Sequence, residues 1–140
     1  MNHRVIKLLG EPVQNEDHAC DEAILPGQLV ERNTDGTVGL QSTAGVTTKI
    51  PLLIALEREE MGQGVDGAYA IGDKVKVGDF PPGTRFSGYI ASGQNLTIGQ
   101  RVEANGAGGF RALASGFPLA TCREATGAVT TATRVAFEAL

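Results

Sequence analysis

The sequence has few of the residues that carry most enzyme chemistry. Its 140 residues include no tryptophan, two cysteines, two histidines and two methionines, and aromatic residues make up only 5%. A nucleophilic triad or a structural zinc site needs several such side chains close together. The only histidines, His3 and His18, both lie in the N-terminal segment. We therefore expect a protein that works through contact surfaces, without enzymatic activity and without a cofactor.

Long apolar runs and concentrations of positive charge are also missing. The longest apolar run is Pro51–Leu56, far short of the roughly 20 residues that span a bilayer. The net charge is −4 and the twelve lysines and arginines are scattered singly, whereas nucleic-acid-binding domains carry a basic face. The first residues, Met1–Arg4, do not open an apolar signal segment. We expect no direct nucleic-acid partner, no membrane association and no secretory signal.

The cysteines and one histidine form the densest group of potential metal ligands. His18, Cys20, Asp21 and Glu22 lie close in sequence, and Cys122 follows about a hundred residues later. A structural zinc site needs four ligands with paired spacing, and only one pair here is local. We expect a polar loop without metal. In a reducing compartment the cysteines are free thiols, with a disulfide as the alternative.

Glycine is abundant, and one glycine-containing phrase occurs three times. Each copy has a glycine, a glutamine or aspartate, one variable residue, a valine and then a charge, which predicts a tight turn leading into a strand. The copies are Ile24-Leu25-Pro26-Gly27-Gln28-Leu29-Val30-Glu31, Ala70-Ile71-Gly72-Asp73-Lys74-Val75-Lys76 and Thr97-Ile98-Gly99-Gln100-Arg101-Val102-Glu103.

Short alternating segments predict an all-β fold of eight to ten short strands. No segment shows a capped apolar stripe with a helical period, although 133–140 is rich in helix-forming residues. The alternation of Val135, Phe137 and Ala139 favours a strand there. This number of strands fits a β-sandwich, a jelly roll or a barrel. Strands are expected within 28–32, 37–42, 47–57, 73–77, 85–91, 110–114, 119–123 and 134–140.

The chain divides into an N-terminal segment, residues 1–23, and a single β domain, residues 24–140. Within the first part, Arg4–Leu9 reads either as an extended arm or as a first core strand, and both readings stay open. Residues 10–23 are polar and acidic, which predicts a long surface loop. A second, glycine-rich loop is expected at 58–67.

The sequence resembles the small decoration, or cement, proteins of tailed-bacteriophage capsids. The similarity covers Leu25–Leu140 and rests on ILPGQLVE, AIGDKVKV, YIASGQNLTIGQRVEANGAGGFRAL and TTATRVAFEAL. Gln100 stands where that family usually has aspartate. The resemblance implies a β-sandwich of jelly-roll type that binds the outer surface of an HK97-like capsid lattice and bridges its subunits. It also implies synthesis in the host cytoplasm, assembly into the virion and no catalytic residues.

A capsid-binding protein needs contact surfaces, and two segments are candidates. The arm supplies apolar anchors, and the 57–67 loop supplies the second contact. The expected partners are the major capsid protein and a second copy of this chain, as a homodimer rather than a trimer. The candidate contact residues are Val5, Ile6, Leu8, Leu9, Glu59 and Met61.

Two other classes of function stay open as alternatives. Glycine-aspartate turns also occur in lipoyl and biotinyl carrier domains, but these need a lysine at a hairpin tip, and Lys74 and Lys76 are predicted inside a strand. The other alternative is a small β-barrel that binds a ligand or acts on it through His18, Cys20 and Cys122.

Overall fold

The protein has an all-β fold, as predicted. The computed structural model describes every residue except 1–4, 59–61 and 63. Its described residues form thirteen strands and no helix. This part of the chain therefore has no helix that could span a membrane. The strands outnumber the predicted eight to ten because several are only two or three residues long. They are β1 (Lys7–Leu9), β2 (Val13–Ala19), β3 (Val30–Arg32), β4 (Val38–Leu40), β5 (Leu53–Ala55), β6 (Lys74–Asp79), β7 (Arg85–Ile90), β8 (Asn95–Leu96), β9 (Arg101–Ala104), β10 (Phe110–Ala112), β11 (Ala120–Cys122), β12 (Gly127–Ala128) and β13 (Thr133–Ala139).

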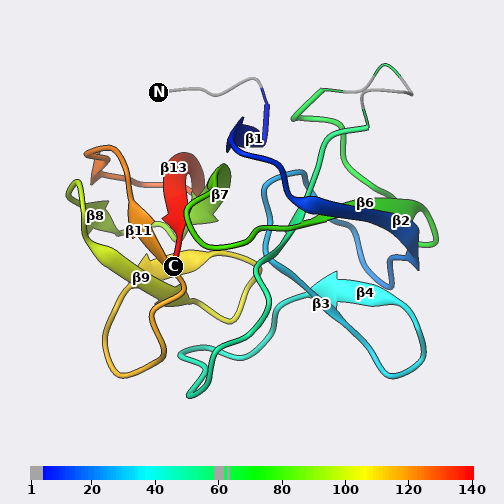
Figure 1. Ribbon diagram of the computed structural model, residues 1–140, viewed down its shortest axis with the longest axis horizontal. Coiled ribbons are helices and arrows are strands. Elements are labelled where there is room, and N and C mark those ends of the chain that lie inside the picture. The colour runs from blue at the N-terminus through cyan, green and yellow to red at the C-terminus, as the bar shows by residue number, and fades with distance from the viewer. Residues whose placement is uncertain (1–4, 59–61, 63) are drawn as a thin grey trace.

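Five of these strands form a small, partly closed barrel. Its circuit runs β7-β10-β9-β11-β13 and returns to β7 through the antiparallel β7–β13 pairing. The link between β7 and β10 is a single parallel pair, Ile90 with Phe110, so closure is weakest there. β7 pairs with β10 only at its last residue, and β1 pairs with its first residues, Arg85 and Phe86. Figure 1 shows this barrel on the left of the molecule. The jelly-roll topology expected from the resemblance stays a prediction.

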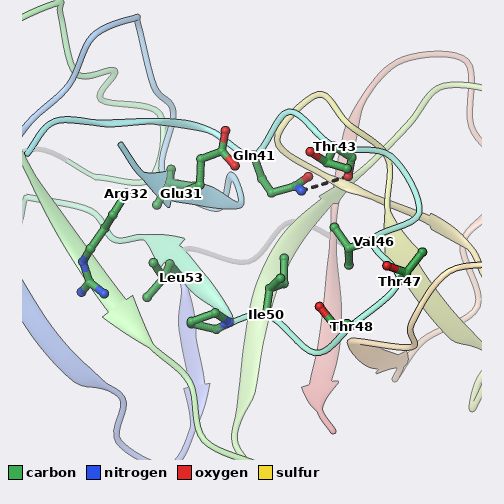
Figure 2. Close-up of a pocket in the computed structure, with 11 residues that line it drawn as sticks. Glu31, Arg32, Gln41, Thr43, Val46, Thr47, Thr48, Ile50 and Leu53 are labelled. Atoms are coloured by element: carbon green, nitrogen blue, oxygen red, sulfur yellow. Dashed lines mark hydrogen bonds between the residues drawn. The ribbon is translucent and has the colours of Figure 1, made fainter. Parts of the chain in front are cut away.

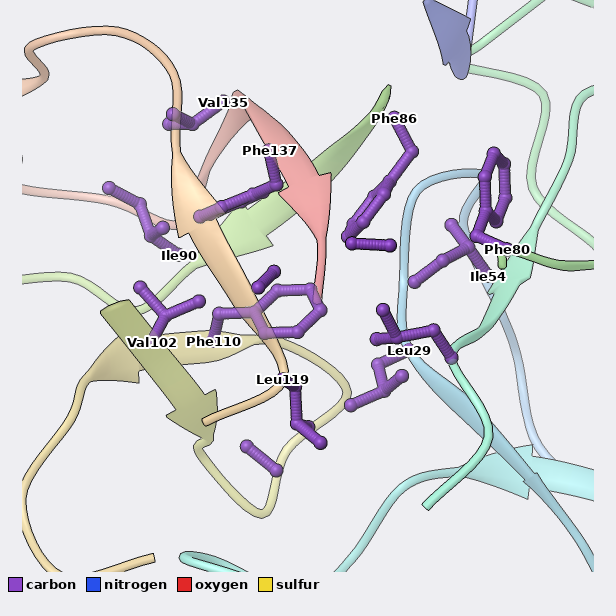
Figure 3. Packing of buried hydrophobic residues seen from close by; sticks show 14 of the residues in the cluster. Leu29, Ile54, Phe80, Phe86, Ile90, Val102, Phe110, Leu119, Val135 and Phe137 are labelled. Carbon is purple, nitrogen blue, oxygen red and sulfur yellow. The ribbon is translucent and has the colours of Figure 1, made fainter. Parts of the chain in front are cut away.

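Phenylalanine rings fill the barrel. Phe86, Phe110 and Phe137 are fully buried, and their ring centroids lie 4.9 to 5.8 Å apart in tilted arrangements. Phe80 extends the cluster, 5.2 Å from Phe86 (Figure 3). Such aromatic pairs stabilise beyond the area that they bury. Four of the five phenylalanines thus form the centre of the core.

A second, smaller core lies on the right of Figure 1. The antiparallel sheet β2-β6-β5 and the hairpin β3–β4 surround it. β5 separates the two cores, because alternate side chains of a strand point to opposite faces. Leu53 and Ala55 pack in the smaller core, whereas Ile54 and Leu56 pack against the barrel. The most apolar segment of the sequence is therefore central, as predicted.

Two of the predicted boundaries were wrong. The surface loop expected at residues 10–23 contains the seven-residue strand β2, which pairs along β6 with one bulge between Asn15 and His18. The strand expected at 47–57 is reduced to Leu53–Ala55. Pro51 explains the second difference, since it has no N–H for a sheet ladder and the chain turns there. The closing segment is a strand, as predicted.

The repeated phrase forms the same turn in all three copies. In each, the residue after the glycine donates its N–H to the carbonyl three residues earlier, at 3.0 to 3.2 Å. The three glycines have φ of +97°, +90° and +85°, a region that favours glycine over residues with a Cβ. Each glycine N–H donates to a carbonyl of another segment, so each turn is also bonded to a part of the chain that is distant in sequence. The glycines are Gly27, Gly72 and Gly99, and the acceptors are Ala55, Cys20 and Cys122 in that order.

Candidate partner-binding surfaces

The N-terminal segment combines a core strand with exposed apolar side chains. Ile6 is fully buried in the main core and its carbonyl accepts a bond from Ser87 N at 2.8 Å. Leu8 is half-buried within β1. Val5 and Leu9 are 41% and 53% exposed. Of the four predicted arm contacts, Val5 and Leu9 are therefore available at the surface, and Ile6 is committed to the fold.

The second predicted contact segment meets the first. Glu57 is only 4% exposed and its Oε2 accepts a hydrogen bond from Ile6 N at 3.2 Å. The two segments lie at the same end of the molecule, at the top of Figure 1. Glu59 and Met61, the predicted contacts of this loop, lie outside the described residues. At Glu57 the predicted contact loop is therefore anchored in the fold by a buried carboxylate.

Two arginines hold the ends of this loop. Arg58 lies over the ring of Tyr69, 4.5 Å from the centroid, and its Nη2 is 3.5 Å from Asp73 Oδ2. Arg134 of β13 donates to Val65 O at 2.8 Å and to Asp66 Oδ1 at 3.0 Å. Both arginine side chains are largely buried, whereas Asp66 is exposed and Asp73 is partly exposed, so solvent screens the two ion pairs. The loop is attached to both cores.

Sequence reasoning missed a groove between β3 and residues 43–53. It has a volume of about 460 Å³, a size typical of ligand pockets. Figure 2 shows Arg32 and Leu53 toward one side of it and Val46 and Thr47 toward the other. Gln41 lines the groove and is 97% enclosed, and its Nε2 donates to Thr43 O at 2.9 Å. No motif marks this site, because its shape depends on how residues 43–53 pack beside β3.

The potential metal ligands singled out in the sequence are dispersed in the structure. Cys20 lies in the smaller core and Cys122 in the main core, and each free thiol donates to a backbone carbonyl at 2.9 Å. His18 Nδ1 is bonded to the carbonyl of Gly36 at 3.1 Å. Burial raises the pKa of Cys122, which lowers its reactivity. Within the described residues, no three of the His, Cys, Asp and Glu side chains form a metal site. Lys74 and Lys76 lie within β6, as predicted.

One buried carboxylate organises a loop of the barrel. Glu103 is fully buried and accepts two hydrogen bonds from Arg111, at 2.7 and 2.9 Å, and one each from Ala114 N and Gly116 N. Burial acts to raise the pKa of Glu103, but these hydrogen bonds outweigh it and hold the pKa below its usual value. Because Arg111 of β10 and the segment that follows it supply all four hydrogen bonds, this group is structural.

Comparison with known proteins identifies the fold. No family model matches the sequence, and no curated protein is significantly similar to it. Among solved structures, the chain is similar to the crystal structure of the N base of head fiber gp8.5 in bacteriophage phi29. The TM-score is 0.57 and the identity 9%, over 91% of this chain and 93% of that chain. This chain therefore has the fold of a phage head fiber base.

Proposed function

We propose that this chain is a structural protein of a bacteriophage virion. It binds the outer surface of an HK97-like major capsid lattice and stabilises it by bridging neighbouring capsid subunits, as a non-catalytic decoration protein. The observation that carries the proposal is the fold likeness to a phage head fiber base over nine-tenths of both chains. The sequence resemblance to capsid cement proteins points in the same direction. A jelly-roll relationship to those proteins belongs to the same proposal.

The end of the molecule where the two predicted segments meet suits such a contact. It presents Val5 and Leu9 on backbone that is fixed by Ile6, β1 and Glu57. A fixed apolar surface loses little conformational entropy on binding. Many copies on one lattice multiply a modest contact through avidity. The major capsid protein is the partner proposed for this end.

Self-association as a homodimer is part of the same proposal. β2 is an end strand of its sheet, and its first residue, Val13, is 72% exposed. An exposed sheet edge can pair with a strand of a second chain. Sedimentation equilibrium of the purified chain measures the assembly: a dimer supports this part, and a monomer at all accessible concentrations contradicts it.

The capsid proposal is tested by co-sedimentation with expanded capsids that lack this protein. Deleting Met1–Leu9 is an unsuitable test because it removes Ile6 from the core. The double variant Val5→Asp/Leu9→Asp leaves the core intact and should weaken binding by about tenfold or more, because avidity amplifies each lost contact. The control Ile98→Asp changes another exposed apolar side chain, on the β8–β9 turn, and should bind normally.

The outcomes separate two conclusions. Binding of the wild type, with greater heat resistance of the capsids, supports the cement function. If the wild type does not bind expanded capsids, that function is wrong. If the wild type and the double variant bind equally, the function stands and the contact lies elsewhere on the molecule.

A further inference from the structure

The groove beside β3 has no part in the contact end described above. We propose that it binds an extended polypeptide segment that carries a carboxylate side chain, with the segment running along the open edge of β3. Assigning that segment to the capsid partner rests on the proposed function. The site itself follows from the backbone and the charges around the groove.

One edge of β3 is already paired. Gln41 N donates to Leu29 O at 3.0 Å, and Asn33 N donates to Thr37 O at 2.8 Å. Both bonds join β3 and its flanking residues to the β4 side of the hairpin. Backbone groups of successive strand residues point alternately to the two sides. Residues 29, 31 and 33 therefore face β4.

The intervening residues face the groove. The carbonyl of Gln28 accepts the N–H of Ala55 at 3.0 Å, on the side opposite to β4. By the same alternation, Val30 and Arg32 direct their backbone groups to this side, and both residues line the groove. The backbone of Arg32 is therefore placed to pair with another chain.

The chain itself does not fill this edge. Pairing between β3 and β5 is limited to the bridge from Leu29 to Ile54, whose antiparallel register would set Arg32 opposite Pro51. Pro51 has no N–H, and its carbonyl accepts from Leu53 N at 3.1 Å, so the ladder ends there. The groove occupies the space into which β5 would have continued. An added strand would restore the interrupted pairing.

The groove walls set the chemistry of the occupant. The apolar side chains of Val46, Ile50 and Leu53 and the hydroxyls of three threonines line the groove, which suits a strand with both apolar and polar residues (Figure 2). Arg32 is exposed and has no ion pair with any residue that the structure describes. Glu31, beside it, already accepts a bond from Ser42 Oγ at 2.8 Å. The unpaired guanidinium therefore favours a carboxylate on the bound segment.

Gln41 supplies a second, independent indication. Its enclosed Oε1 has no hydrogen-bond donor among the described residues. A buried acceptor without a donor destabilises the fold, and a donor from a bound segment would relieve that cost. A polypeptide offers N–H donors at regular spacing, whereas a simple anion offers none. The acceptor and the guanidinium together favour an acidic peptide.

The test is an NMR titration of the free protein with two capped pentapeptides, Ac-Thr-Val-Asp-Val-Thr-NH2 and its asparagine counterpart. The aspartate peptide should shift the amide signals of Arg32 and Leu53 and bind about threefold to tenfold tighter than the asparagine peptide. Arg32→Gln should abolish that difference. The control Arg123→Gln, at an exposed arginine just after β11, should preserve it.

Equal affinities for the two peptides, or shifts confined to other surfaces, would overturn the proposal. Binding of Arg32→Glu to expanded capsids then tests the source of the segment. Wild-type binding with at least threefold weaker binding of the variant supports a capsid segment. Peptide binding without any capsid binding leaves the groove valid and contradicts the capsid function, so the two failures are distinguishable.

Discussion

Asp73 makes two hydrogen bonds with Ala70 across the same turn: its Oδ2 accepts the N–H of Ala70 at 2.9 Å, and its own N–H donates to the carbonyl of Ala70 at 3.0 Å. This reciprocal closure explains why the repeated phrase needs a glutamine or aspartate directly after its glycine. The side chains of aspartate and glutamine each carry an acceptor oxygen that reaches back across the turn. The side-chain bond recurs from Leu25 to Gln28 at 2.7 Å and from Thr97 to Gln100 at 3.0 Å.

Removing this side-chain acceptor should weaken the fold measurably. Gln100→Leu leaves the Thr97 N–H to water and should lower the free energy of unfolding by about 0.5–1.5 kcal/mol, the typical worth of one hydrogen bond. Gln100→Asp keeps an acceptor, as in the copy with Asp73, and should restore most of the loss. Urea denaturation monitored by circular dichroism measures both. Equal stability of all three proteins would show that the main-chain bond alone closes the turn.

Local signals of this kind made most turns and strands predictable. The glycine and the acceptor are two adjacent residues, and the Asn33–Gly36 turn joins β3 to β4 as the sequence indicates. β2 was missed because its own side chains are mostly polar. Its strand conformation comes from pairing with β6, about sixty residues later, and no short window contains both partners.

The candidate contacts were predictable only in part for a similar reason. Val5, Ile6, Leu8 and Leu9 look alike as apolar residues, and only the packing of β1 on β7 decides which are buried. The groove beside β3 depends on where the chain leaves the sheet at Pro51. Its lining residues all lie within 30–53, but no local sequence pattern indicates how the chain after β4 packs beside β3.

The aromatic core should not accept a methyl group at Gly88. A Cβ there would lie 2.9 Å from Phe110, 3.1 Å from Phe86 and 3.2 Å from Phe137. Three rings would have to move, so Gly88→Ala should lower the free energy of unfolding by about 1–3 kcal/mol. Gly64→Ala is the control, because its Cβ meets nothing within 4 Å. Matching denaturation midpoints for the two variants would contradict this packing.

The N-terminal segment should behave as a core strand in stability measurements. Ile6→Ala removes a fully buried side chain and should cost about 2–5 kcal/mol. Val5→Ala, at the exposed neighbour, should change stability by less than about 0.5 kcal/mol. Thermal and urea denaturation of both variants would compare them directly. A small effect at Ile6 would instead favour a detached arm.

Replacing the buried carboxylate should change both stability and its pH dependence. Glu103→Gln replaces one acceptor oxygen by a donor that faces Arg111 or two amides, and should lower the free energy of unfolding by about 2–4 kcal/mol at neutral pH.

The folded pKa of Glu103 lies below the 4.5 of an ordinary glutamate, so its stabilisation is complete above that pH and is lost as pH falls through the folded pKa. The difference in stability between wild type and variant should therefore shrink as the pH falls below 4.5, measured by urea denaturation. Glu138→Gln, at a partly exposed ion pair with Arg85, should show only a small effect. A constant difference across that range would mean that Glu103 is not ionised in the fold.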